Sequence, residues 1–196
     1  MRTRDTEKED LVRQKAIELI VNEGFDGFSM QKLAKAAQIS PATLYIYYKD
    51  RDDLLVKLCL SVVDDMLAIS LKDFHPELPF AEGMALQWRN RLEFFMKYPL
   101  ETEFLEQARY SPLYAKVQVG IASKFGSVLG PFVHRAIENG ELQRLSFEVY
   151  WSVAFAPLYQ LMKFHNQGLG PSGVKFQLTE PVMKQALGLV LKALKP

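Results

Sequence analysis

The sequence predicts an all-α fold with an N-terminal three-helix domain and a larger helical C-terminal domain. Apolar residues recur three and four positions apart along nearly all of the 196 residues, which places them on one face of a helix. Serine and aspartate stand before several of these segments, and glycine or proline separates them, as at the ends of helices. The alternation of apolar and polar residues that marks half-buried strands is absent from the sequence.

The N-terminal domain contains three expected helices. The first covers residues 6–23 and ends at Gly24, because glycine is favoured just beyond the last turn of a helix. Ser29 caps a short second helix. Ser40 caps the third, with Pro41 at its first position, where the missing N–H leaves no helical hydrogen bond unmade.

A longer fourth helix, capped by Asp50, covers residues 51–71 and joins the two domains. We place the N-terminal domain at residues 1–50 and the C-terminal domain at residues 51–196. Residues 72–79 contain two prolines and are expected to form a loop. Five further helices are expected at 80–98, 100–109, 113–139, 147–167 and 179–195.

The composition is that of an ordinary soluble protein, with 48% hydrophobic residues, 24% charged residues and a net charge of +1. The single cysteine, Cys59, excludes an internal disulfide and agrees with a location in the reducing cytoplasm. No apolar stretch is long enough to span a bilayer, so we expect no membrane association.

Few residues suggest chemistry. Cys59 lies in an apolar stretch and is expected to be a small buried hydrophobe. His134 and Glu138 are four positions apart on an expected helix, but two metal ligands without a third are a weak signal. We therefore expect no catalytic residue, no metal site and no cofactor.

The second and third helices are joined by a tight turn at residues 38–40 and form a helix-turn-helix. In this motif the second helix lies in the major groove of DNA, with its N-terminal residues facing the base edges. Tyr47 and Lys49 come at the end of that helix, where a hydroxyl and an ammonium group can contact phosphates. The N-terminal residues are small, so the backbone can approach the DNA closely: Ser40, Pro41, Ala42 and Thr43.

The stretch GFDGFSMQKLAKAAQISPATLYIYYKDRDDLL, residues 24–55, resembles the DNA-binding signature of the TetR (tetracycline-repressor-like) family. Matching positions include Leu33-Ala34, Ile39-Ser40 and Thr43-Leu44-Tyr45, while Ser29 stands where threonine is usual. The resemblance covers about the first quarter of the chain, and the rest is similar in length and helical character alone. It implies an all-α homodimer whose C-terminal domain binds a small ligand and thereby releases DNA.

The resemblance also implies which residues contact DNA. Lys32 is an expected phosphate contact near the start of the second helix, and Tyr45 has an alternative role as a packing residue. The first 57 residues contain as many acidic as basic side chains, so non-specific binding should be modest and strongly salt-dependent. With Ser40 from the motif itself, the expected DNA-binding set is Gln31, Lys32, Ser40, Pro41, Ala42, Thr43, Tyr45, Tyr47 and Lys49.

The C-terminal domain is rich in aromatic residues, which are either ordinary core residues or the lining of an apolar ligand cavity between helices. Arg89, Arg91 and Arg109 are the arginines near them, and one that points inward would favour an acidic lipophilic ligand. The expected pocket residues are Trp88, Phe95, Tyr98, Phe104, Arg109, Phe125, Trp151, Phe155 and Tyr159.

The last two expected helices carry apolar faces that either form a four-helix interface across a two-fold axis or complete the core of the monomer. A homodimer through these helices would bind a palindromic double-stranded DNA operator. We therefore expect a homodimeric repressor released from its operator by a small hydrophobic ligand. In one alternative, the C-terminal domain binds a protein partner or only dimerises. In another, the protein is a helical enzyme, which would need a titratable cluster that the sequence does not offer.

Overall fold

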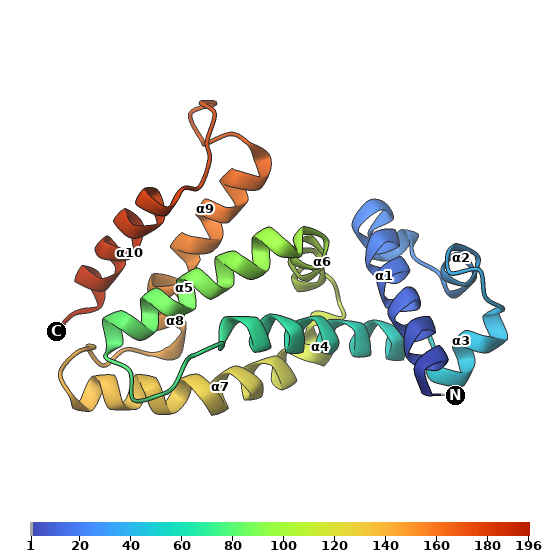
Figure 1. Ribbon diagram of the computed structural model, residues 1–196, viewed down its shortest axis with the longest axis horizontal. Coiled ribbons are helices and arrows are strands. Elements are labelled where there is room, and N and C mark those ends of the chain that lie inside the picture. Colours follow the sequence, from blue (N-terminus) through green and yellow to red (C-terminus); the bar gives the residue numbers. More distant parts are fainter. Residues whose placement is uncertain (1) are drawn as a thin grey trace. The chain divides into compact units, whose positions relative to one another are not determined.

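The computed structural model describes the chain from Arg2 to Pro196, with side chains from Glu7 onward (Figure 1). The described residues form helices and no extended strand, so the predicted all-α fold is confirmed. None of the helices in this part of the chain is long and apolar enough to cross a bilayer. The helices are α1 (Arg2–Gly27), α2 (Met30–Ala36), α3 (Pro41–Tyr47), α4 (Arg51–Ser70), α5 (Phe80–Lys97), α6 (Pro99–Arg109), α7 (Tyr114–Glu138), α8 (Phe147–Ala154), α9 (Ala156–Gln167) and α10 (Glu180–Leu194).

The chain divides into two compact units that interleave along the sequence. The first unit consists of the chain up to Met66 together with residues 97–124, so it contains α1 to α3, most of α4, α6 and the first part of α7. The second unit consists of residues 67–96 and 125–196, with α5, the rest of α7 and α8 to α10. The long helices α4 and α7 therefore each contribute to both units.

In the first unit, α1 begins at Arg2, earlier than the expected start at residue 6. The polar residues 2–5 carry no apolar periodicity, so the sequence gives no sign that they are helical. Gly24 has φ 74° and ψ 170°, so it interrupts the helix where the sequence predicted a stop. Helix α6 packs against α1. The ring centroids of Phe25 and Phe104 are 5.9 Å apart, and the Gln107 side chain donates a hydrogen bond to the Val21 carbonyl at 3.2 Å. The first helix thus shares a core with a helix that comes much later in the chain.

In the second unit, one expected helix at 147–167 is two helices, α8 and α9. The chain leaves helical geometry at Phe155, with φ −127° and ψ −30°, and Pro157 follows. Proline has no N–H and its ring clashes with the carbonyl four residues before it, so the helix cannot continue. The Trp88 indole N–H donates to the Ala154 carbonyl at 2.9 Å and satisfies this backbone group at the break.

Gly83 allows α5 to approach α7 closely within the second unit. A Cβ atom at this position would lie 2.5 Å from Cε2 of Phe132. We expect Gly83→Ala to lower the free energy of unfolding by about 1–2 kcal/mol, because overpacking outweighs the better helix propensity of alanine. Chemical denaturation measures this, with Gly126→Ala as the control, since a Cβ at Gly126 meets nothing within 4 Å. Equal stabilisation of both variants would contradict the close approach.

Candidate nucleic-acid interface

The helix-turn-helix is built as the sequence predicted, with a side-chain cap at the start of each short helix. The Ser29 hydroxyl accepts a hydrogen bond from the Lys32 N–H at 3.2 Å, and the Ser40 hydroxyl accepts one from the Thr43 N–H at 3.2 Å. These bonds satisfy N–H groups that a helix leaves unpaired in its first turn. Helices α2 and α3 pack against each other, and α2 packs against α1, as Figure 1 shows.

The turn between α2 and α3 is a Schellman motif with an unusual residue. Gln38 adopts the left-handed conformation, with φ 54°. Its N–H donates to the Lys35 carbonyl at 3.2 Å, and the Ile39 N–H donates to the Ala34 carbonyl at 3.0 Å. This pair of bonds defines the motif, in which glycine is the usual left-handed residue. The turn therefore holds a small backbone strain at an exposed glutamine.

Replacement of Gln38 by glycine should relieve this strain. We expect Gln38→Gly to raise the free energy of unfolding by up to about 1 kcal/mol, reduced by the greater freedom of glycine in the unfolded chain. Gln38→Val should lower it, because a β-branched side chain tolerates the left-handed region poorly. Thermal unfolding of the two variants beside the unaltered protein measures both effects. If glycine were the more destabilising residue, the left-handed turn would be refuted.

Helix α3 has one buried side and one open side. Leu44 is fully buried, whereas Tyr45 is 55% and Ile46 is 77% exposed. Ala42 is also exposed and lies on the same face as Tyr45 and Ile46, by helical spacing. We call Ala42, Tyr45 and Ile46 the open face of α3. The sequence interpretation missed Ile46, although its position opposite Leu44 already indicated that it faces outward.

The other predicted DNA contacts also lie on or beside this motif. Gln31 is exposed on α2, and Pro41 is exposed at the start of α3. Thr43 is half-buried, and its hydroxyl lies 2.9 Å from the hydroxyl of Ser40. Lys49 is exposed just beyond α3, and its backbone N–H donates to the Asp53 carboxylate at 2.9 Å. The structure thus places the predicted DNA-binding residues around α3 and the preceding helix.

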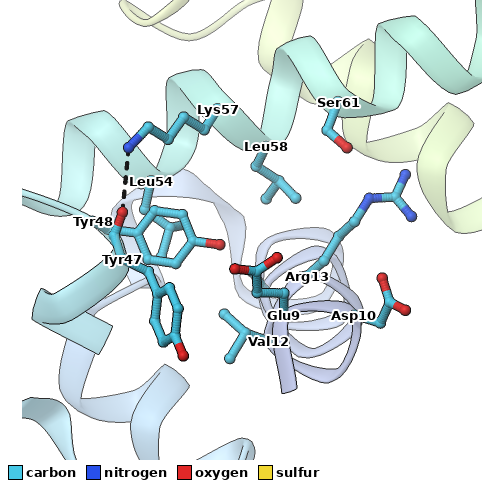
Figure 2. A pocket seen from close by; sticks show the side chains of 11 residues that line it. Glu9, Asp10, Val12, Arg13, Tyr47, Tyr48, Leu54, Lys57, Leu58 and Ser61 are labelled. Atoms are coloured by element: carbon cyan, nitrogen blue, oxygen red, sulfur yellow. Dashed lines mark hydrogen bonds between the residues drawn. The ribbon is translucent and has the colours of Figure 1, made fainter. Parts of the chain in front are cut away.

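A groove of about 330 Å³ lies behind the end of α3, between this helix, α1 and α4 (Figure 2). Tyr47 and Tyr48 line it, and the Lys57 ammonium group donates to the Tyr47 carbonyl at 3.3 Å. Lys57 also lies over the Tyr48 ring, 5.6 Å from its centroid. Burial, followed by the charges of Glu9 and Asp53, raises the pKa of Tyr48 above its ordinary value. Tyr48 is therefore neutral and serves to pack the end of α3, as its half-buried position indicates.

Two cationic side chains, Lys32 and Arg51, form hydrogen bonds that stabilise the connection between α1 and α2. The Lys32 ammonium group pairs with Glu23 at 2.5 Å and donates to the Gly27 carbonyl at 2.8 Å. The Arg51 guanidinium donates to the carbonyls of Phe25 and Phe28 and lies over the Phe28 ring. A phosphate contact by Lys32 would therefore compete with bonds inside the domain.

The residues expected to form a ligand pocket are divided between the two units. Tyr98, Phe104 and Arg109 belong to the first unit, where Phe104 is buried against Phe25 and Arg109 is exposed. The other six expected pocket residues belong to the second unit. These are Trp88, Phe95, Phe125, Trp151, Phe155 and Tyr159.

Groups that could support catalysis or metal binding are scarce. Cys59 is buried, and burial raises the pKa of its thiol to about 12, so it is an inert core residue as predicted. Among the described residues, no group of three or more histidine, cysteine, aspartate or glutamate side chains is placed to hold a metal ion.

Comparisons with known proteins agree with this geometry. Residues 8–58 match the family model of bacterial regulatory proteins of the tetR family. An uncharacterized HTH-type transcriptional regulator of Haemophilus influenzae is 29% identical over 149 residues, which are 76% of this chain and 78% of that protein. A TetR family transcription regulator from Marinobacter aquaeolei has a crystal structure that matches with a TM-score of 0.87 and 26% identity, over 100% of this chain and 99% of that one.

A further match shows the same fold at lower identity. The transcriptional regulator FadR of Bacillus subtilis, solved in complex with stearoyl-CoA, has a TM-score of 0.76 and 17% identity, over 95% of this chain and 99% of its own. The family match covers the helix-turn-helix and the start of α4, and the fold likeness extends over the whole chain. The chain is therefore a transcriptional regulator of the TetR family.

Proposed function

We propose that this regulator is a homodimeric repressor that leaves a palindromic operator when a small apolar ligand binds to its second unit. The observation that carries the DNA-binding part is the open face of α3. Leu44 is buried in the core of the domain and anchors the helix there, whereas Tyr45 and Ile46 on the opposite side are exposed to solvent. Side chains as exposed as these contribute little to packing within the domain, and they suit the base edges and thymine methyl groups of a major groove.

The apolar surface of the last helices supports the homodimer. Phe147 and Val149 on α8 are 59% and 48% exposed, and Leu189 on α10 is 62% exposed. Large apolar side chains that stay exposed on these helices are of the kind that an interface between subunits covers. A two-fold axis through these helices would place the two reading helices about 34–36 Å apart, which is one turn of DNA.

The ligand part rests on the aromatic interior of the second unit and on the stearoyl-CoA complex of FadR, which shares the fold. A ligand that binds one of two dimer states more tightly shifts the population toward it by that difference in affinity. If only the other state fits the operator spacing, ligand binding releases DNA. In the alternative, the second unit dimerises or binds a protein and no ligand is involved.

Footprinting on the DNA upstream of its own gene tests this proposal, with sedimentation to determine the mass of the bound species. We expect protection of two inverted half-sites one turn apart by a single dimer. A monomer bound to an asymmetric site would refute the dimeric reading. Protection that no apolar ligand reverses would favour the alternative without a ligand.

A further inference from the structure

One arginine in the second unit is buried without a charged partner. Arg91 on α5 is 2% exposed. Among the side chains that the structure describes, no carboxylate forms an ion pair with it. Arginine cannot lose its proton in a protein. A buried guanidinium without a counter-charge costs free energy, so its presence needs an explanation.

Neutral groups accept hydrogen bonds from only two of the three nitrogens of this guanidinium. Its Nε donates to the Tyr159 hydroxyl at 3.3 Å, and Nη1 donates to the Gln87 side-chain oxygen at 3.1 Å. Its Nη2 has no hydrogen-bond partner, and neither does Nε2 of Gln87, which is itself fully buried. Two adjacent side chains thus each have a buried donor with no acceptor.

The surroundings of these donors are aromatic. The guanidinium carbon lies 4.3 Å from the centroid of the Phe155 ring and 5.9 Å from that of Phe125. Trp151 packs between these two rings, with centroid distances of 4.8 Å to Phe155 and 5.4 Å to Phe125. Aromatic faces offset part of the buried charge, but they do not accept hydrogen bonds as an anion does.

We propose that Arg91 and Gln87 receive the carboxylate of an apolar organic acid. This deepens the proposed function and rests on it, because it names the class of ligand that the second unit takes. A carboxylate has two oxygens in the geometry that a guanidinium and a neighbouring amide can meet together. A single arginine with a neutral amide balances one negative charge. This favours a free acid over a thioester of coenzyme A, whose phosphates carry several charges.

Phe155 lies both at this site and at the break between α8 and α9. Its ring covers the guanidinium, and its backbone forms the junction between α8 and α9. An acid that binds Nη2 would therefore lie beside this ring, next to the junction between α8 and α9.

Tryptophan fluorescence tests the site in the full-length protein, since the chain has two tryptophans and both lie in the second unit. The probes are straight-chain acids from octanoate to palmitate, phenylacetate and indole-3-acetate, each paired with its neutral alcohol, together with palmitoyl-CoA. The variant is Arg91→Met, and the control is Arg89→Met, which changes an exposed arginine on the same helix. Circular dichroism tests whether each variant is folded.

We expect at least one acid to bind about 100-fold more tightly than its alcohol to the unaltered protein and to Arg89→Met, and this preference to vanish in Arg91→Met. The comparison of acid with alcohol needs no variant, so the proposal stays testable if Arg91→Met does not fold. Equal binding of acid and alcohol, no binding of any acid, or acid binding that Arg91→Met leaves unchanged overturns it. Tight binding of palmitoyl-CoA without free-acid binding overturns it as well.

Operator binding, measured on the same samples, separates this proposal from the proposed function. A protein that binds its operator but no acid keeps the regulatory assignment and loses the carboxylate site. A protein that binds an acid through Arg91 without releasing its operator keeps the site and loses ligand-controlled release.

Discussion

Replacement of Tyr45 and Ile46 together by alanine should weaken operator binding by about 100-fold or more, with little change in the melting temperature. Each side chain that reaches a base edge contributes about 1–3 kcal/mol to discrimination, and the two losses combine. Tyr45 and Ile46 are 55% and 77% exposed, so the fold depends little on them. Fluorescence anisotropy on the footprinted operator measures the affinity, and thermal unfolding measures the stability.

Val119→Ala is the matched control, because Val119 is 73% exposed in the same unit but lies on α7. It should leave operator affinity unchanged. An unchanged affinity in the Tyr45→Ala/Ile46→Ala variant would show that the open face of α3 does not read DNA. A loss of affinity that accompanies unfolding would assign these residues a structural role instead.

Trp88→Ala should lower the free energy of unfolding by about 3–5 kcal/mol, which is among the largest costs for a single side chain. Trp88 is fully buried, and its indole N–H supplies the bond to the Ala154 carbonyl at the α8–α9 break. Its removal leaves both a cavity and an unpaired buried carbonyl. Urea denaturation at fixed protein concentration measures the loss, since the stability of an oligomer depends on concentration.

Trp88→Phe separates the two causes, because it keeps most of the ring and removes the N–H. We expect it to cost about 1–3 kcal/mol, since a buried acceptor is left without a donor. If Trp88→Phe were neutral, the Ala154 carbonyl would need no donor at the break. If Trp88→Ala were also mild, the second unit would not be built around this side chain.

Much of the helix-turn-helix could be predicted from the sequence, because its signals are local. The caps at Ser29 and Ser40 and the burial of Leu44 follow from residue types at fixed spacing, and the structure has all three. Pro157 is an equally local signal for the break between α8 and α9, which the single expected helix at 147–167 does not include. Ile46 is not among the positions that match the family signature, so the resemblance gives no signal for it.

The tertiary arrangement could not be read from the sequence. Helical periodicity shows that α6 has an apolar face, but it does not show that Phe104 packs against Phe25 rather than in a ligand pocket. It also could not select Arg91 among the arginines near the aromatic residues, since burial depends on which helices meet. These features arise from contacts between residues far apart in the chain, for which one sequence carries no signal.

Sequence-specific binding of DNA by this regulator is tested most directly by fluorescence anisotropy. The unaltered protein is titrated onto DNA from upstream of its own gene and onto a scrambled duplex, across a series of salt concentrations. We expect tight binding to the upstream DNA, weak binding to the scrambled DNA, and affinities that fall linearly with salt on logarithmic axes. Absence of binding to either duplex at low salt, with the protein shown to be folded, would contradict sequence-specific binding.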